Sequence, residues 1–171
     1  MKNEKGFSLI ELLIVVAIIL IIAAIAIPNL LRARIAANES SAVASERTIN
    51  TSQVAYQTAY PAVGYANQLS DLGPGGATCA APASNNACLI DAVLAGGTKS
   101  GYNFAVTPLA GGPPNTGYVT GAAPQNFNTS GVRRFCSVDD FVIRADPNTA
   151  KSTTAEIVYA NCQAAPYVAL Q

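Results

Sequence analysis

The sequence predicts an α+β fold in which one long N-terminal helix packs on a small antiparallel sheet of three or four strands. Residues 7–27 are apolar except for Ser8 and Glu11, and a helix-forming pattern without glycine continues to about Ala59. From residue 62 the composition changes to Gly, Pro, Asn, Ser and Thr around short apolar stretches, which is typical of short strands joined by turns. The 171 residues suffice for one domain with such a helical extension.

The first element, residues 7–27, is long enough to span a membrane. As a helix it would extend about 32 Å at about 1.5 Å per residue, and a hydrocarbon core is about 30 Å thick. Lys2 and Lys5 precede it, so the short leading end is expected to stay in the cytoplasm while the rest is exported. The segment therefore predicts a single-pass membrane precursor.

Two simpler interpretations of this segment fit less well. A cleaved secretory signal would explain the small-x-small pattern of residues 24–26, but the apolar run is long for such a signal and contains an acid near its start. A plain membrane anchor would explain the length and the lysines, but it gives Glu11 no purpose.

Glu11 is the one acid in this apolar run, and an unpaired carboxylate in hydrocarbon is costly. If the chain is cut between Gly6 and Phe7, the new amine on Phe7 lies one helical turn before Glu11 on the same face. The Phe7 amine of a neighbouring chain is a better partner, because bundled helices with an axial offset bring the two groups together. Glu11 is therefore predicted to select one offset during assembly, while the apolar helices supply non-specific attraction.

The second half of the helix is predicted to be amphipathic and to extend to Ala59, before Tyr60 and Pro61. From Phe7 to Ala59 it would measure roughly 80 Å at about 1.5 Å per residue. One apolar stripe runs through Leu31, Ile35, Ala42, Ile49 and Tyr56. The charged residues are expected to lie mostly away from this stripe: Arg32, Arg34, Glu39, Glu46 and Arg47.

The two halves of the helix differ in what they can bury. The inner half is apolar all round, so it must sit in lipid or in a bundle of identical helices. A coiled-coil dimer is a weaker alternative, because the stripe contains few large residues. Pro28 cannot donate a backbone hydrogen bond and is expected to kink or loosen the helix, either as a static bend near the membrane surface or as a weak point during assembly.

The stretch KGFSLIELLIVVAIILIIAAIAIP, residues 5–28, closely resembles the signal of type IV pilins and of the pseudopilins of type II secretion. The resemblance covers residues 5 to about 35. It implies that a dedicated membrane peptidase cleaves between Gly6 and Phe7 and N-methylates Phe7. It also implies that Glu11, the fifth mature residue, makes the assembly contact with the Phe7 amine, and that Pro28 is the family's proline.

This resemblance divides the chain into four segments. Residues 1–6 are a cleaved leader, 7–28 a transmembrane and assembly helix, 29–60 the amphipathic half of that helix, and 61–171 a globular pilin head. The implied partners are other copies in a helical homopolymer, the prepilin peptidase and methyltransferase, membrane lipid before assembly, and an inner-membrane platform with its ATPase. The precursor is expected in the bacterial inner membrane with its C-terminal domain exported.

The head begins with a predicted short helix over residues 85–97. An asparagine caps it, Leu89 and Val93 share one face, and Gly96 ends it.

The predicted strands follow this helix. Alternating Tyr102, Phe104 and Val106 predict a strand over 101–108, and residues 117–124 predict a weaker one. Residues 132–146 predict two strands that turn at Asp139 and Asp140, and residues 155–162 a short final strand. Such an antiparallel sheet is expected to bury one face against the helix and to show the other to water.

The four cysteines allow three pairings, of which Cys79–Cys88 and Cys136–Cys162 are the ones we predict. The first closes a short loop, and the second resembles the C-terminal disulfide loop of many type IV pilins. A zinc site is the rival interpretation, but the sequence has no CxxC pair and no histidine.

The composition disfavours enzyme and nucleic-acid functions. Without histidine, Ser-His-Asp and Cys-His catalysis is excluded, and no cofactor motif is present. Lys and Arg balance Asp and Glu at ten each, so no basic excess predicts a specific nucleic-acid site. Asp139, Asp140 and Asp146 are interpreted as turn residues rather than calcium ligands, because too few carboxylates share one loop.

The leading functional prediction is a pilin that polymerises through its N-terminal helix into an extracellular type IV pilus for adhesion, surface motility or DNA uptake. A pseudopilin of the G type, forming a short periplasmic filament in type II secretion, is the close alternative. A membrane-anchored binding module is the alternative from another class, and it predicts stable monomers that do not depend on Glu11.

Overall fold

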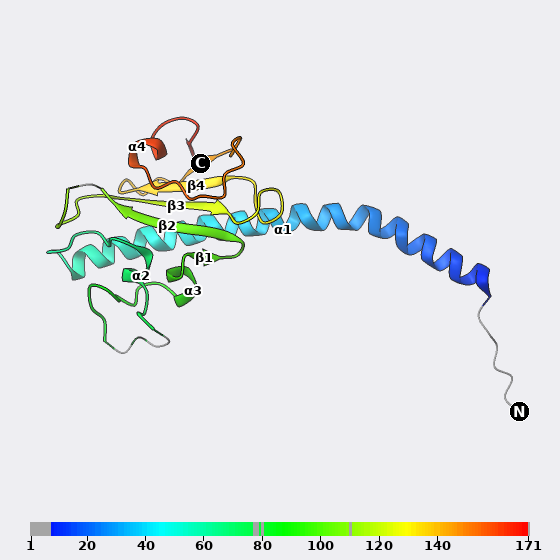
Figure 1. Cartoon of the computed structure of the whole chain (residues 1–171), viewed down its shortest axis with the longest axis horizontal. Coiled ribbons are helices and arrows are strands. Elements are labelled where there is room, and N and C mark those ends of the chain that lie inside the picture. The colour runs from blue at the N-terminus through cyan, green and yellow to red at the C-terminus, as the bar shows by residue number, and fades with distance from the viewer. Residues whose placement is uncertain (1–7, 77–78, 80, 110, 171) are drawn as a thin grey trace, which may run out of the picture. The chain divides into compact units, whose positions relative to one another are not determined.

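α1 (Leu9–Ala59) is an uninterrupted helix in the computed structural model, and a head of short strands and helices follows it (Figure 1). The structure describes residues 8–76, 79, 81–109 and 111–170. The chain divides after Arg34 into two compact units. The predicted end of the helix at Ala59 is confirmed, and Pro61 follows two residues later.

The part of α1 up to Arg34 exposes almost all of its side chains to the surroundings. Large apolar residues from Leu9 to Leu30 are about half exposed or more. The helix is long and apolar enough to cross a membrane by length and composition. Pro28 lies inside the helix without interrupting it, so the predicted weak point does not divide α1 into two helices.

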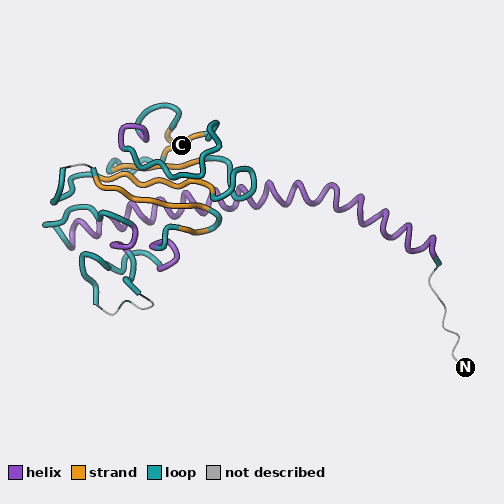
Figure 2. Tube along the Cα trace, in the orientation of Figure 1, coloured by secondary structure: helices purple, strands orange, loops and turns teal. Residues whose placement is uncertain are grey.

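The head contains one antiparallel sheet whose strands follow each other in chain order (Figure 2). The strands are β1 (Thr98–Lys99), β2 (Tyr102–Pro108), β3 (Tyr118–Pro124), β4 (Arg134–Val138), β5 (Arg144–Asp146) and β6 (Val168–Ala169). The sheet is larger than the three or four strands expected, because the two-residue strands β1 and β6 extend its edges. The predicted α+β class is confirmed.

The residues of α1 from Ile35 onward pack on one face of this sheet. Ala42, Ile49 and Tyr56 from the predicted stripe are buried, and they share a core with residues of β2, β3 and β4. Burying each large apolar side chain of this kind stabilises the fold by roughly 1.5–3 kcal/mol. The predicted stripe is therefore confirmed where it meets the head.

The other face of the sheet is also covered, contrary to the prediction that it meets water. Val119 and Val138 form a second core with Cys136, Cys162 and Tyr167. Glycine is required at Gly121 of β3, because a side chain there would collide with the backbone of Glu156. The C-terminal segment thus lies across β3, whose seven residues are all buried (Figure 1).

Two predicted elements are wrong in detail. Residues 155–162 form no strand; they cross the sheet and end in α4 (Tyr159–Cys162), because the disulfide holds Cys162 over the sheet face rather than at its edge.

The helix expected over residues 85–97 is the single turn α3 (Ala92–Ala95). Asp91 caps it instead of an asparagine, accepting a hydrogen bond from the Leu94 N–H at 3.0 Å. Leu94 faces the core, whereas Leu89 and Val93 are exposed. A further turn, α2 (Leu69–Leu72), packs beside it.

Glu39 and Glu46 do not lie away from the buried face of α1 as expected. Both are buried, because the head covers more of the helix surface than the single line of apolar residues that was predicted.

Candidate functional site at the helix start and in the head

Glu11 lies in the first turn of α1, where its carboxylate caps the start of its own helix. The backbone N–H of Ser8 donates a hydrogen bond to Oε2 of Glu11 over 2.9 Å. The order Ser-x-x-Glu is the capping-box pattern, in which the acid satisfies a free backbone donor at the helix start. The positive end of the helix dipole also favours a carboxylate there. Glu11 is thus turned toward the helix start, where the predicted cleavage would create an amine.

The predicted cleavage pair, Gly6 and Phe7, lies outside the described residues. The contact between Glu11 and the Phe7 amine, and the methylation of Phe7, therefore remain predictions.

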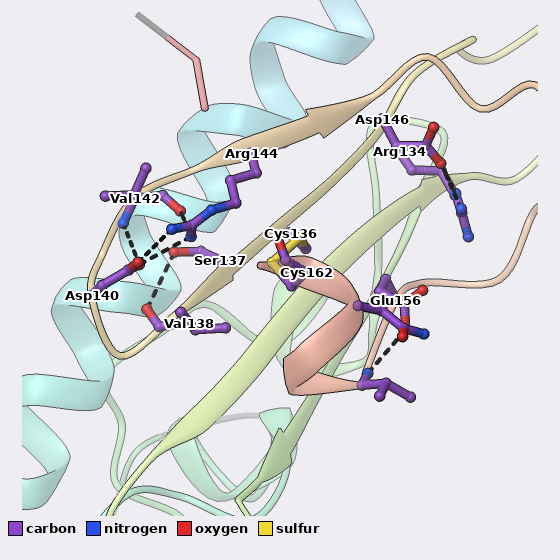
Figure 3. Close-up of a disulfide and its surroundings, with 12 residues drawn as sticks. Arg134, Cys136, Ser137, Val138, Asp140, Val142, Arg144, Asp146, Glu156 and Cys162 are labelled. Atoms are coloured by element: carbon purple, nitrogen blue, oxygen red, sulfur yellow. Dashed lines mark hydrogen bonds and ion pairs between the residues drawn. A yellow bond between two sulfur atoms is a disulfide. The ribbon is translucent and has the colours of Figure 1, made fainter. Parts of the chain in front are cut away.

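The disulfide between Cys136 and Cys162 joins β4 to α4, as predicted (Figure 3). It closes a loop with a sequence separation of 26 residues, and both cysteines are buried. A second disulfide joins Cys79 to Cys88 across a sequence separation of nine.

Replacing Cys136 and Cys162 together with serine should lower the free energy of unfolding of the head by about 3 kcal/mol, because the unfolded chain regains the entropy of the open loop. Replacing Cys79 and Cys88 should have a smaller effect, because their loop is shorter. Urea unfolding of the full-length protein in detergent, followed by near-UV circular dichroism, compares the two. Equal midpoints for both double variants would contradict this ranking.

The three aspartates considered as calcium ligands are bound to three different partners. Asp139 accepts a hydrogen bond from the Tyr159 hydroxyl, Asp140 pairs with Arg144, and Asp146 pairs with Arg134. The last two pairs are visible in Figure 3. The Arg144 guanidinium holds the pKa of Asp140 below its usual value. Within the described ranges no three potential metal ligands gather in one place.

Glu39 ties α1 to the loop between β3 and β4. Its Oε1 accepts hydrogen bonds from the backbone N–H groups of Val132 at 3.1 Å and Arg133 at 3.0 Å. Its Oε2 accepts one from Nε of Arg133 at 2.8 Å. The Glu39 carboxylate is nearly buried, and both of its oxygens accept hydrogen bonds. These bonds position the head on the helix.

Glu46 is completely buried between α1 and the sheet. Burial raises the pKa of its carboxyl to about 8, and the neighbouring Thr120 hydroxyl offsets only part of that rise. Neither the carboxyl oxygens nor the Thr120 hydroxyl makes a hydrogen bond of normal geometry to any described residue. At neutral pH the group is therefore mostly a neutral acid.

A polar network lies one turn further along the same interface. Nδ2 of Asn50 donates to the Ser137 hydroxyl at 2.9 Å, and the Tyr118 hydroxyl donates to Oδ1 of Asn50 at 2.8 Å. These bonds fix how α1 sits on β3 and β4.

The sequence contained the signal for the burial of Glu39 and Glu46, because positions 39, 42, 46, 49, 53 and 56 share one helical face.

A groove of about 620 Å³ runs along the head part of α1 beside the turn between β4 and β5. Its lining is mostly apolar and comprises Arg47, Asn50, Thr51, Val54, Ala55 and Phe141.

Comparison with known proteins bears on the start of the chain. Residues 1–27 match the model of the prokaryotic N-terminal methylation motif. The chain carries this motif. This match bears out, for the start of the chain, the resemblance found in the sequence.

Two curated relatives are themselves pilus proteins. Over 40 residues the chain is 68% identical to the type IV wide pilus major component PilA4 of Thermus thermophilus, covering 23% of this chain and 30% of that relative. Over 54 residues it is 46% identical to the type IV major pilin protein PilA of Myxococcus xanthus, covering 32% of this chain and 24% of that relative. The chain thus matches less than a third of either relative's length. No solved structure matches the chain.

Proposed function

We propose that this chain is the structural subunit of an extracellular type IV pilus and that it polymerises through its N-terminal helix. The observation that carries the proposal is the apolar part of α1, whose described side chains up to Arg34 find no cover within their own compact unit. Burying so much apolar surface requires lipid or other copies of the same helix. The methylation motif at the start of this helix supports the proposal that the chain is cleaved and methylated before it assembles.

The proposed maturation creates the assembly contact. The prepilin peptidase cleaves between Gly6 and Phe7 and methylates the new amine of Phe7. A positive charge then lies beside Ser8, whose N–H already bonds the Glu11 carboxylate. Within a bundle, Glu11 of one copy meets the Phe7 amine of the next, because an unpaired carboxylate surrounded by apolar helices is costly.

The remaining assignments follow the same division of the chain. Residues 1–6 are the leader, 7–28 the transmembrane and assembly helix, 29–60 its amphipathic continuation, and 61–171 the head. The inner-membrane platform and its ATPase supply the force, so the chain's own work is mechanical rather than enzymatic. The pilus would serve adhesion, motility or DNA uptake.

The two relatives support a pilin rather than a pseudopilin, because both are named as major pilus components.

Shearing the cells and taking the intact mass of the chain in the released fraction tests the proposal. We expect abundant protein that begins at methylated Phe7 and lacks the four hydrogens of two disulfides. The same processed species confined to the cell envelope would instead indicate a pseudopilin. A mature chain that retains residues 1–6, or that begins at Ile27, would contradict the proposed assembly contact.

A further inference from the structure

We infer that neighbouring heads in the filament bind each other through two different surfaces of this chain, and that each head uses both. The first is the groove on α1, defined by Arg47, Thr51, Val54 and Phe141. The second is the outer patch, defined by Leu109, Glu156, Ile157 and Val158. This inference rests on the proposed polymer and assigns the head contact within it.

The groove is an apolar surface with one positive charge. Val54 and Phe141 are 42% and 46% exposed, although both are large apolar side chains. The Thr51 hydroxyl donates to the Arg47 carbonyl at 3.0 Å, so its polar group is already used. Arg47 takes part in none of the ion pairs found among the described residues.

The outer patch is likewise an apolar surface with one charge, but its charge is negative. Ile157 and Val158 are 42% and 49% exposed, and Leu109 lies beside them along a shallow hollow of about 300 Å³. Glu156 accepts hydrogen bonds only locally, its Oε1 taking the Val158 N–H at 3.0 Å. It too is absent from the ion pairs seen in the described part of the chain. The two surfaces are thus complementary in charge, because each is apolar and one carries an unneutralised acid while the other carries an unneutralised base.

The two surfaces lie on opposite sides of the sheet. The groove is on α1, which packs on one face, whereas the Glu156 backbone lies against Gly121 on the other face. Figure 1 shows α1 and the segment that leads to α4 on either side of the strands. A contact between two unlike surfaces is heterologous and repeats from copy to copy, whereas groove-to-groove contact would close at a dimer.

The size of the surfaces explains why this contact needs the filament. A stable interface usually buries about 800 Å² on each partner and involves about 20 to 30 residues a side, whereas the groove and the outer patch are defined by four residues each. Tethering the heads through their assembled helices raises their effective concentration and allows a weak contact to form. Arg47 and Glu156 then select which surfaces meet, because a rim charge pair contributes more to specificity than to affinity.

Thiol cross-linking in sheared filaments tests the contact. The full-length double variant T51C/V158C, treated with a short bis-maleimide, should give a ladder of dimers, trimers and higher multimers on a denaturing gel. The native cysteines do not react, because all four are in disulfides. The matched control V93C/V158C carries an exposed thiol on α3 and should give only the background of the single variants.

Each outcome decides the inference. No ladder from filaments present in normal amounts overturns it, and so does a dimer from T51C alone, which would mean groove-to-groove contact. Absence of the wild-type chain from the sheared fraction defeats the proposed function instead.

Charge exchange decides the matter if the double-cysteine variant does not assemble. Arg47→Glu and Glu156→Arg should each lower the sheared filament yield by about 2- to 5-fold, as expected for loss of an exposed ion pair. The double exchange should restore the yield, and failure to restore it overturns the contact.

Discussion

Replacing Glu46 with glutamine is expected to stabilise the head at neutral and alkaline pH and to remove most of a pH dependence that the wild-type protein shows. The pKa of the buried carboxyl is raised from about 4.5 to about 8. Between these two values the unfolded chain has lost the proton while the folded chain still holds it. Folding must therefore take up a proton, and the free energy of unfolding falls as the pH rises.

The magnitude follows from the width of that window. Stability should be highest near and below pH 4.5 as far as this group is concerned, fall by about 1.4 kcal/mol per pH unit, and level off above pH 8. The total is on the order of 5 kcal/mol. Tyr118 bonds Asn50 on the same side of the sheet as Glu46, whereas Tyr167 lies in the second core on the other side. Burial raises the pKa of both hydroxyls, so they stay neutral throughout this window.

The measurement is urea unfolding of the full-length protein in detergent at several pH values between 5 and 9. The difference in midpoint between Glu46→Gln and wild type should grow as the pH rises to about 8 and then level off. Glu156→Gln serves as the matched control, because it makes the same substitution at a partly exposed position on the outer patch. Parallel curves for Glu46→Gln and wild type would mean that Glu46 is ionised in the folded head.

Much of the fold could be predicted because its signals are local. The helix to Ala59, the buried stripe through Ile49 and the turn at Asp139 and Asp140 each follow from neighbouring residues. The burial of Glu46 was predictable in principle, because it lies four residues from Ala42 and three from Ile49 on the same face. It was missed because a charged residue was expected to face water, whereas the head extends over that part of the helix.

The parts that could not be predicted depend on contacts between distant segments. Residues 155–162 contain β-branched residues typical of a strand, yet they cross the sheet face where Gly121 leaves room for the Glu156 backbone. The local sequence pattern does not predict this contact, because Gly121 and Glu156 are 35 positions apart in the chain. At the candidate site, the sequence predicted the importance of Glu11 but not its hydrogen bond to the Ser8 N–H, although the Ser-x-x-Glu order was visible.

Because of that hydrogen bond, Glu11 has two candidate roles, which are capping of α1 and pairing with a neighbour's amine. Two variants of Glu11 distinguish these roles. If the carboxylate only caps α1, glutamine should replace it, because a glutamine side chain also accepts the Ser8 N–H. If the negative charge pairs with the Phe7 amine of a neighbour, glutamine should fail as alanine does. We expect both Glu11→Gln and Glu11→Ala to lower the sheared filament yield more than about 10-fold, since an unpaired buried ammonium costs several kcal/mol.

Membrane insertion and cleavage report whether this loss arises at assembly. Both variants should accumulate in the inner membrane, because either substitution makes the apolar segment more favourable in lipid. Their leaders should be removed normally, as the mass of the membrane-extracted chain would show. Normal filaments from Glu11→Gln but none from Glu11→Ala would assign Glu11 to helix capping alone. Normal filaments from both would mean that the helices find their offset without this carboxylate, by apolar packing only.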